Sequence, residues 1–175
     1  MLATALRIEP ADGCGAHVSG VDLAAASDAD ITAIRRALFD HGALFFRNQT
    51  ITPEQHIALA ERIAPIDVNR FFPAAPGYPV IAKVEKTAEQ TTNIGGGWHT
   101  DHSYDREPAM GSVLVARDLP PSGGDTLFAD MYAAWETLDQ ALKDEVRGLR
   151  AVHGSDHVFG EKGVYAKTDQ PELAK

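Results

Sequence analysis

The run Trp98-His99-Thr100-Asp101-His102 carries side chains suited to binding a metal ion. Alternate side chains of an extended strand share a face, so His99 and Asp101 would project together while His102 faces the other way. An imidazole beside a carboxylate supplies two of the three ligands of a facial triad, which holds Fe(II) and leaves coordination positions open. The spacing therefore makes a metal site with His99 and Asp101 as ligands one interpretation of this run, and we expect His102 to be a polar strand residue outside such a site.

Other interpretations of the His-x-Asp pattern stay open at this point. The pattern also occurs by chance in many proteins, where it marks a surface strand with a local His–Asp hydrogen bond. A zinc-dependent hydrolase could use the same two ligands, although the sequence has no further pair of ligands at zinc-like spacing. The preceding Gly95-Gly96-Gly97 is either a mobile lip over the metal or a plain loop.

Two helices and a strand form the expected scaffold in the first third of the chain. The range 27–42 is predicted to be a helix because Ser27 can cap its start, Asp30 can return the bond, and apolar residues recur on one face. The apolar range 43–47 follows as a short buried strand. A Thr-Pro start predicts a second helix over 52–65.

Short strands are expected to dominate after this second helix. Candidates separated by Pro, Gly and polar clusters lie at 80–84, 98–102, 111–116 and 126–129. The range 130–149 returns to helical spacing. The pattern predicts an α+β fold with a mainly β core and flanking helices.

Composition limits the classes of partner. The chain has 175 residues, of which 44% are hydrophobic and 23% are charged, as is typical of one soluble folded domain. Sixteen Lys and Arg residues against 25 Asp and Glu residues give a formal charge of −9, which repels phosphate backbones and anionic lipids. We therefore expect neither nucleic acid nor a membrane surface as a partner.

Cysteine usage and the apolar runs indicate a compartment. The single Cys14 excludes an intrachain disulfide and any multi-cysteine metal site. The N-terminus has no basic region followed by a long apolar stretch, and the apolar runs elsewhere are too short to span a bilayer. These features predict a cytoplasmic protein.

Two further motifs follow the triglycine and the His-x-Asp pattern. They are Pro108-Ala109-Met110-Gly111 and Leu119-Pro120-Pro121-Ser122-Gly123-Gly124-Asp125-Thr126. Together, in this order, the motifs resemble the taurine dioxygenase family of Fe(II)- and 2-oxoglutarate-dependent enzymes, which includes phenoxyacetate-degrading dioxygenases. The resemblance extends from about Ile8 to His157.

This resemblance implies a particular fold. The family forms a double-stranded β-helix, or jelly roll, and the strands that close the barrel are expected beyond Lys175. Residues 1–175 would then be the N-terminal portion of a single dioxygenase domain, incomplete at its C-terminus. Such an incomplete chain would be a fragment of a longer enzyme, a truncated gene product, or a half that needs a partner.

The resemblance also assigns roles to individual residues. It implies that His99 and Asp101 ligate Fe(II), and that the Thr126 hydroxyl helps hold the distal carboxylate of 2-oxoglutarate, the cosubstrate used with O2. Without the resemblance, Thr126 reads as an ordinary β-branched residue opening a strand. Asn69 and Phe72 match positions where taurine-oxidising members place a His and a Tyr around the sulfonate, and Gly95 matches an Asn.

The family's third iron ligand is a distal histidine followed by an arginine that pairs with 2-oxoglutarate, both expected beyond Lys175. His153 and His157 are not expected to replace that histidine, and two ligands alone should bind Fe(II) weakly. The predicted function is a dioxygenase that hydroxylates a small organic acid or sulfonate and releases succinate and CO2. The alternative is a truncated, non-catalytic remnant or interaction module. Self-association as a homo-oligomer is left open.

Overall fold

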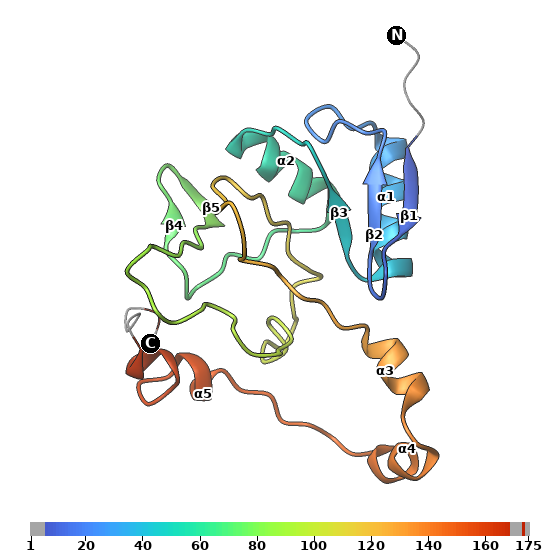
Figure 1. The fold of residues 1–175 in the computed structure, drawn as a ribbon, viewed down its shortest axis with the longest axis vertical. Helices are drawn as coiled ribbons and strands as arrows, with labels where there is room; N and C mark the ends of the chain where they lie inside the picture. Colours follow the sequence, from blue (N-terminus) through green and yellow to red (C-terminus); the bar gives the residue numbers. More distant parts are fainter. Residues whose placement is uncertain (1–5, 169–172, 174–175) are drawn as a thin grey trace. The chain divides into compact units, whose positions relative to one another are not determined.

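The computed structural model describes residues 6–168 and 173. The chain forms two compact units: residues 1–63 with 114–149 make the first, and residues 64–113 with 150–175 make the second. Figure 1 labels the helices and strands of each unit.

The first unit begins with a small mixed sheet. Strand β1 (Arg7–Pro10) pairs antiparallel with β2 (Ala16–Ser19), and β2 pairs parallel with β3 (Leu44–Phe46). Only β3 matches a predicted strand. The turn into β2 needs a glycine, because Gly15 has a φ of +88° and a Cβ there would lie 2.7 Å from the Phe45 ring.

Helix α1 (Asp28–His41) confirms the first predicted helix and its cap. The Asp30 amide donates to the Ser27 hydroxyl, and the Asp30 carboxylate accepts from the Ser27 amide, which is a capping box. These bonds satisfy amides that the first turn leaves without partners. The Ser27 hydroxyl also donates to the Asp30 carboxylate at 2.7 Å, and this bond, followed by the bond from the Ser27 amide, lowers the pKa of the Asp30 carboxyl. The helix ends at Gly42, whose amide donates to the Leu38 carbonyl.

Helix α2 (Pro53–Ile63) follows β3 and confirms the second predicted helix. Its start also has reciprocal bonds, since the Gln55 amide donates to the Thr52 hydroxyl and the Thr52 amide donates to the Gln55 side chain. Helix α1 packs against both α2 and β3 (Figure 1). One cluster of buried residues in the unit consists of Ala26, Ile31, Ile51 and Leu59, with Val115 packed against them.

The range 130–149 forms two helices rather than the single predicted one. Helix α3 (Met131–Thr137) ends at Leu138, whose ψ of 139° is extended, and α4 (Gln140–Val146) starts immediately afterwards. The Thr137 hydroxyl bonds back to carbonyls of its own helix, and Asp139 is a residue type that favours a new start. Helical spacing continues across this break, so periodicity alone did not reveal it.

The second unit contains a hairpin and two short helical turns. Strands β4 (Ala74–Ala75) and β5 (Tyr78–Ala82) pair antiparallel around Gly77, whose φ is +81°. Strand β5 overlaps the predicted strand 80–84 but begins and ends earlier. The C-terminal part adds α5 (Asp156–Phe159) and the 3-10 turn η1 (Tyr165–Lys167).

Aromatic rings hold the second unit together. The ring of Phe159 stacks on Phe71 with centroids 3.9 Å apart and lies 5.5 Å from the ring of Tyr165. The Tyr104 ring meets the edge of Phe71 at 6.0 Å. Phe71 and Tyr165 are buried, so these rings join the segment before β4 to α5 and η1.

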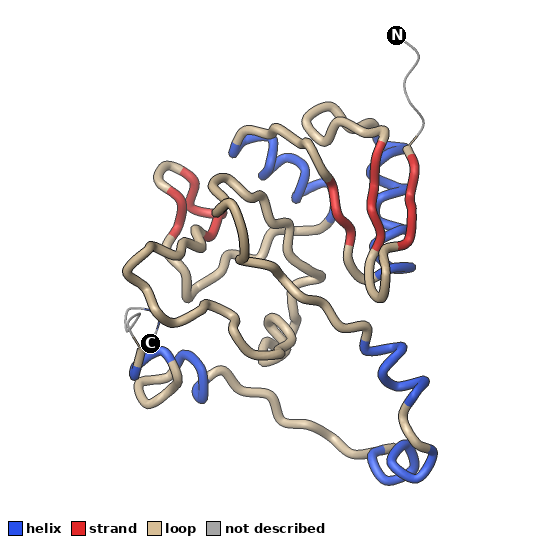
Figure 2. The backbone as a smooth tube through the Cα atoms, in the orientation of Figure 1, coloured by secondary structure: helices blue, strands red, loops and turns tan. Residues whose placement is uncertain are grey.

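Three predicted strands are wrong for this structure. The ranges 98–102, 111–116 and 126–129 belong to neither sheet, and Figure 2 draws them as loop. The first range ends in a turn because His102 has a φ of +54°, outside the extended region. The other two have no strand beside them among the described residues, and a strand needs a ladder partner.

The described residues therefore show an α+β chain with two small sheets, and they form no closed barrel. Within the same part of the chain, no helix is long and apolar enough to cross a membrane.

Candidate metal centre

The structure brings His99 and Asp101 together in the second unit. The Nε2 atom of His99 lies 3.2 Å from Oδ1 of Asp101. The Nδ1 atom of His99 lies 2.8 Å from the Gly97 carbonyl oxygen. Since that oxygen can only accept, Nδ1 carries the proton and donates it, which leaves a lone pair on Nε2 in the neutral imidazole.

Two electron-pair donors therefore face one another. The neutral Nε2 of His99 and the Asp101 carboxylate are both acceptors, so the contact needs a positive charge. That charge is either a second proton on the imidazole, giving a local ion pair, or a metal ion bound by both atoms. Neighbouring ligands around an octahedral ion with bonds of about 2.1 Å are about 3 Å apart, close to the spacing of this pair.

The pair is open to solvent. The side chain of His99 is 54% exposed and that of Asp101 is 66% exposed. An ion held there would keep coordination positions for other ligands, as a facial triad requires. The donor set thus fits Fe(II), although the two side chains meet through a turn and not through the predicted alternation along a strand.

A second group of metal-ligand side chains lies in the same unit. One ligand atom from each of Asp67, His102 and Asp105 lies within 4.8 Å of the other two. The Nδ1 atom of His102 is 3.0 Å from Asp105 Oδ2 and 3.3 Å from Asp67 Oδ2. These contacts of His102 were not predicted, because the range 98–102 was expected to be a strand. The acid three residues after His102 is the signal in the sequence that could have indicated the contact with Asp105.

Arg70 completes this second group. Its Nη2 atom donates to Asp105 Oδ1 at 2.5 Å. The bond from Arg70, and to a smaller extent the one from His102, lowers the pKa of the Asp105 carboxyl, while the same ion pair raises the pKa of Arg70. The adjacent Tyr104 has its phenol pKa raised, first by burial and then by the charge of Asp105.

Asn69, predicted to contact substrate, belongs to the same network. Its amide nitrogen lies 3.5 Å from Nε2 of His102. Its side-chain oxygen accepts from the backbone amides of Phe71 and Phe72, at 2.9 and 3.0 Å. The structure thus uses Asn69 to shape the turn that presents Phe72.

Gly95, the third residue predicted to contact substrate, approaches His99. It has a φ of +68°, and a Cβ at this position would lie 3.3 Å from Cε1 of the His99 ring. A side chain there would press on the imidazole as well as strain the backbone.

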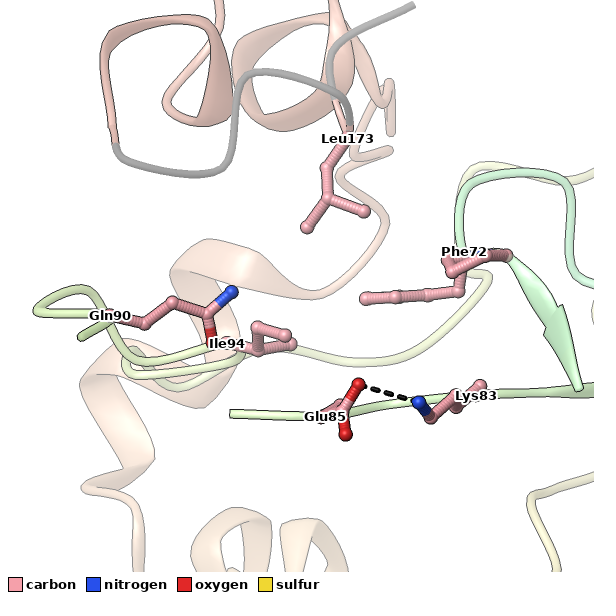
Figure 3. Close-up of a pocket in the computed structure, with 7 residues that line it drawn as sticks. Phe72, Lys83, Glu85, Gln90, Ile94 and Leu173 are labelled. Atoms are coloured by element: carbon pink, nitrogen blue, oxygen red, sulfur yellow. Dashed lines mark hydrogen bonds and ion pairs between the residues drawn. The ribbon is translucent and has the colours of Figure 1, made fainter. Parts of the chain in front are cut away.

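Phe72 lines a pocket in the second unit. Figure 3 shows the side chains of Phe72, Ile94 and Leu173 around a common space, with an ion pair between Lys83 and Glu85 below them. The Lys83–Glu85 distance is 2.6 Å. The remaining lining residues are Pro73 and Gln90. Ile94 immediately precedes Gly95 in the chain.

The other predicted positions are placed as follows. Thr126 lies exposed in a loop of the first unit, and its predicted role stays a prediction. His153 donates or accepts a 2.9 Å hydrogen bond with the Ser103 hydroxyl, and His157 lies in α5.

Comparison with known proteins identifies the family. The sequence model of the family described as "Taurine catabolism dioxygenase TauD, TfdA family" matches residues 7–174. The chain is 33% identical to the (S)-phenoxypropionate/alpha-ketoglutarate-dioxygenase of Sphingobium herbicidovorans, and the match covers 99% of the chain and 62% of that protein. It is also 33% identical to the alpha-ketoglutarate-dependent 2,4-dichlorophenoxyacetate dioxygenase of Cupriavidus pinatubonensis, covering 91% of the chain and 61% of that protein.

Solved structures show the same relationship. A taurine dioxygenase from Burkholderia xenovorans superposes with a TM-score of 0.70 at 30% identity, covering 82% of this chain and 51% of that one. The chain thus spans about three fifths of the length of the curated relatives and about half of the solved one. Since the family model matches nearly the whole sequence, the chain belongs to the TauD/TfdA family of taurine catabolism dioxygenases.

Proposed function

We propose that this chain carries the His-x-Asp part of an Fe(II)- and 2-oxoglutarate-dependent dioxygenase that hydroxylates a small organic acid or sulfonate. The observation that carries the proposal is the pair of acceptors in the His99–Asp101 contact, 3.2 Å apart and open to solvent. Family membership favours a metal ion over a second proton as the source of the positive charge. Two relatives named for phenoxy acids and one named for taurine support the substrate class.

Each proposed residue has one task in this reaction. When bound, Fe(II) would supply the activation of O2 and the oxidation that converts 2-oxoglutarate to succinate and CO2. The Gly97 carbonyl accepts from Nδ1 of His99 and so orients the ring with Nε2 free to bind the ion. Asp101 would contribute an anionic oxygen that offsets part of the charge of the ion, and a third protein ligand would complete the facial triad. The Thr126 hydroxyl would donate to a carboxylate of 2-oxoglutarate.

The Phe72 pocket suits an organic acid with an apolar body. Phe72, Ile94 and Leu173 offer apolar walls, while the ammonium group of Lys83 can attract an anionic head. Glu85 already neutralises Lys83 in part, so a bound acid would share that ammonium group. Ile94, which forms one wall, precedes Gly95 in the chain, and a side chain at Gly95 would have little room beside the His99 ring.

The jelly-roll fold is part of the same proposal. Residues 114–128 carry apolar side chains that are largely exposed in the first unit, including Leu114, Leu119 and Leu127 at 72–73%. We propose that further strands pair with this region and cover these side chains, which would make residues 1–175 the N-terminal portion of one dioxygenase domain.

The decisive experiment removes a ligand in the full-length protein. His99→Ala should abolish Fe(II)-dependent formation of succinate from 2-oxoglutarate, whereas His157→Ala on α5 should leave it unchanged. Unaltered turnover in His99→Ala would remove His99 from the iron site. Failure of the unmodified protein to form succinate, with properly reconstituted Fe(II), would favour the non-catalytic alternative.

A second experiment tests the pocket. Lys83→Gln should raise the KM for a phenoxy acid with little change in kcat, because the lost charge acts on binding. Lys86→Gln is a matched control, since Lys86 bonds to Asn93 and does not line the pocket. Equal KM values for Lys83→Gln and the unmodified protein would exclude Lys83 from substrate binding.

A further inference from the structure

His102 is held in a backbone conformation that a histidine seldom adopts. Its φ of +54° lies in the left-handed region, which glycine adopts freely and which other residues adopt uncommonly, Asn, Asp and His more often than the rest. A residue stays in such a conformation only where surrounding contacts hold it there. His102 follows Asp101 directly, so the contacts that hold its backbone also fix the backbone of the proposed ligand.

These contacts run in two directions from the imidazole ring. On one side, Nδ1 donates to Asp105, with Asp67 close by, and the ring stacks on Tyr104 at 5.7 Å. On the other side, Nε2 lies 3.5 Å from the Asn69 amide nitrogen. His102 therefore connects the turn after Asp101 with the segment 67–72.

A metal ion is a poorer explanation of this group than hydrogen bonding. Arg70 already donates to Asp105 at 2.5 Å, and its guanidinium charge would repel a cation. The Nδ1 atom of His102 faces carboxylate oxygens and so carries a proton, which a metal would have to displace. Both oxygens of Asp105 and the Nε2 atom of His102 face donors, unlike the paired acceptors of His99 and Asp101.

We propose that His102 is a positioning residue, which fixes Asp101 for metal binding and at the same time fixes the turn at Asn69 that presents Phe72. The inference rests on the proposed function, because it takes His99 and Asp101 as the ligands. It goes further in assigning a role to a side chain that binds neither metal nor substrate, and in linking the iron site to the substrate pocket.

The experiment is a titration of the whole chain with Co(II), in which the visible absorption of the bound ion is recorded at each addition. His102→Gly removes both contacts and keeps the backbone conformation accessible. His102→Asn also tolerates that conformation, and its amide nitrogen can take the place of Nδ1 towards Asp105, so it should rescue part of the effect. His157→Asn is the matched control on α5, and His99→Ala reports on the ligand itself.

The expected result is a graded loss. His102→Gly should weaken Co(II) binding about tenfold, as loss of outer contacts to a metal site does, and should change the absorption spectrum at saturation. His102→Asn should lie between His102→Gly and the unmodified chain, and His157→Asn should match the unmodified chain. A spectral change at full occupancy separates altered ligand geometry from a general loss of stability, which would leave the bound spectrum unchanged.

Three outcomes would overturn the proposal. Affinity and spectrum that stay unchanged in His102→Gly would show that His102 positions nothing. Loss of one of two bound Co(II) ions in His102→Gly, with the other retained, would make the group a second metal site instead. If His102→Gly fails to fold, the test is made with His102→Asn and Asn69→Ala. Co(II) affinity and absorption spectra that match the unmodified chain in both variants would also refute the proposal. Undiminished binding in His99→Ala would instead overturn the proposed function.

Discussion

Two histidines three residues apart, His99 and His102, meet carboxylates in contrasting ways. His99 and Asp101 are 54% and 66% exposed and bring two acceptors face to face. His102 and Asp105 are only 16% and 18% exposed, and here Arg70 and the imidazole Nδ1–H supply donors to the carboxylate. The same residue types therefore have different roles. The His99–Asp101 pair still needs a cation, whereas His102 and Asp105 belong to a structural network whose acceptors have donors.

This difference teaches that ligand types and proximity do not by themselves identify a metal site. By clustering alone, the group of Asp67, His102 and Asp105 has more ligand-type side chains than the His99–Asp101 pair. Counting donors against acceptors reverses the order, because the guanidinium of Arg70 and the Nδ1–H of His102 already donate to the two oxygens of Asp105.

The largest effect is expected from paired substitutions of the two acids. Asp101→Asn should lower Fe(II) or Co(II) affinity more than a hundredfold, because an anionic ligand becomes a neutral amide that the ion binds poorly. Asp105→Asn, an identical chemical change four residues away, should lower it by no more than about tenfold. Metal titration of both variants checks this, and a larger loss in Asp105→Asn would reverse the assignment of the two clusters.

A large effect on stability is expected at the aromatic support behind the satisfied network. Phe71 is buried between Phe159, Tyr104 and the guanidinium of Arg70. Phe71→Ala should reduce the free energy of unfolding by about 3 kcal/mol, through lost burial and the cavity left behind. Phe39→Ala is the control, since Phe39 is 67% exposed on α1 and should change stability by under about 0.5 kcal/mol. Chemical denaturation measures both, and equal effects would contradict the described packing.

Local signals explain which parts of the fold could be predicted from sequence. Both helix starts were found because a cap and its returning side chain lie within four residues of one another, as at Ser27 and Asp30. The strands at 111–116 and 126–129 depend on a partner strand, which these residues cannot encode by themselves. The short strands β1 and β2 were missed, since they are stabilised by pairing, and β2 pairs with β3, which follows only after helix α1.

The candidate site was predicted in part for the same reason. The closeness of His99 and Asp101 follows from their spacing, and it survives although the backbone turns where a strand was expected. The role of His102 did not follow, because it depends on a left-handed backbone and on Asp67, which lies 35 residues earlier in the chain. Such a long-range contact leaves no periodic pattern in the sequence.

A smaller effect, on the binding of 2-oxoglutarate, is expected at Thr126. It tests the solvent-exposed His99–Asp101 site through the cosubstrate that would bind there. Thr126→Val removes a hydroxyl at nearly constant shape and should weaken 2-oxoglutarate binding by roughly 1.5–3 kcal/mol, the range for a hydrogen bond to a charged group. Thr126→Ser should restore most of the affinity, and Thr32→Val on α1 should leave it unchanged. Calorimetric titration of the metal-loaded protein provides the measurement. An unaltered affinity in Thr126→Val would exclude Thr126 from the site.

The smallest effect is expected in the acid stability of the satisfied network. The bond from Arg70 lowers the folded-state pKa of Asp105 below its usual value, so the ionised carboxylate stabilises the fold. This contribution is present above the unfolded-state pKa, about 3.9, and is lost as the pH falls through the lower folded-state value. The charged or titratable groups that face Asp105 are Arg70, His102, Asp67 and Tyr104.

Asp105→Asn should therefore be less stable than the unmodified chain at pH 6, and the difference should shrink as the pH falls below about 4, where the native carboxylate also becomes neutral. Unfolding free energies measured between pH 2 and pH 6 test the sign. Asp30→Asn is a useful second variant, because the pKa of Asp30 is also lowered, but by hydrogen bonds from Ser27 in the first unit. If the difference in unfolding free energy between Asp105→Asn and the unmodified chain instead grew on acidification, the ionised carboxylate would destabilise the fold. Asp105 would then not belong to a network whose hydrogen bonds are satisfied.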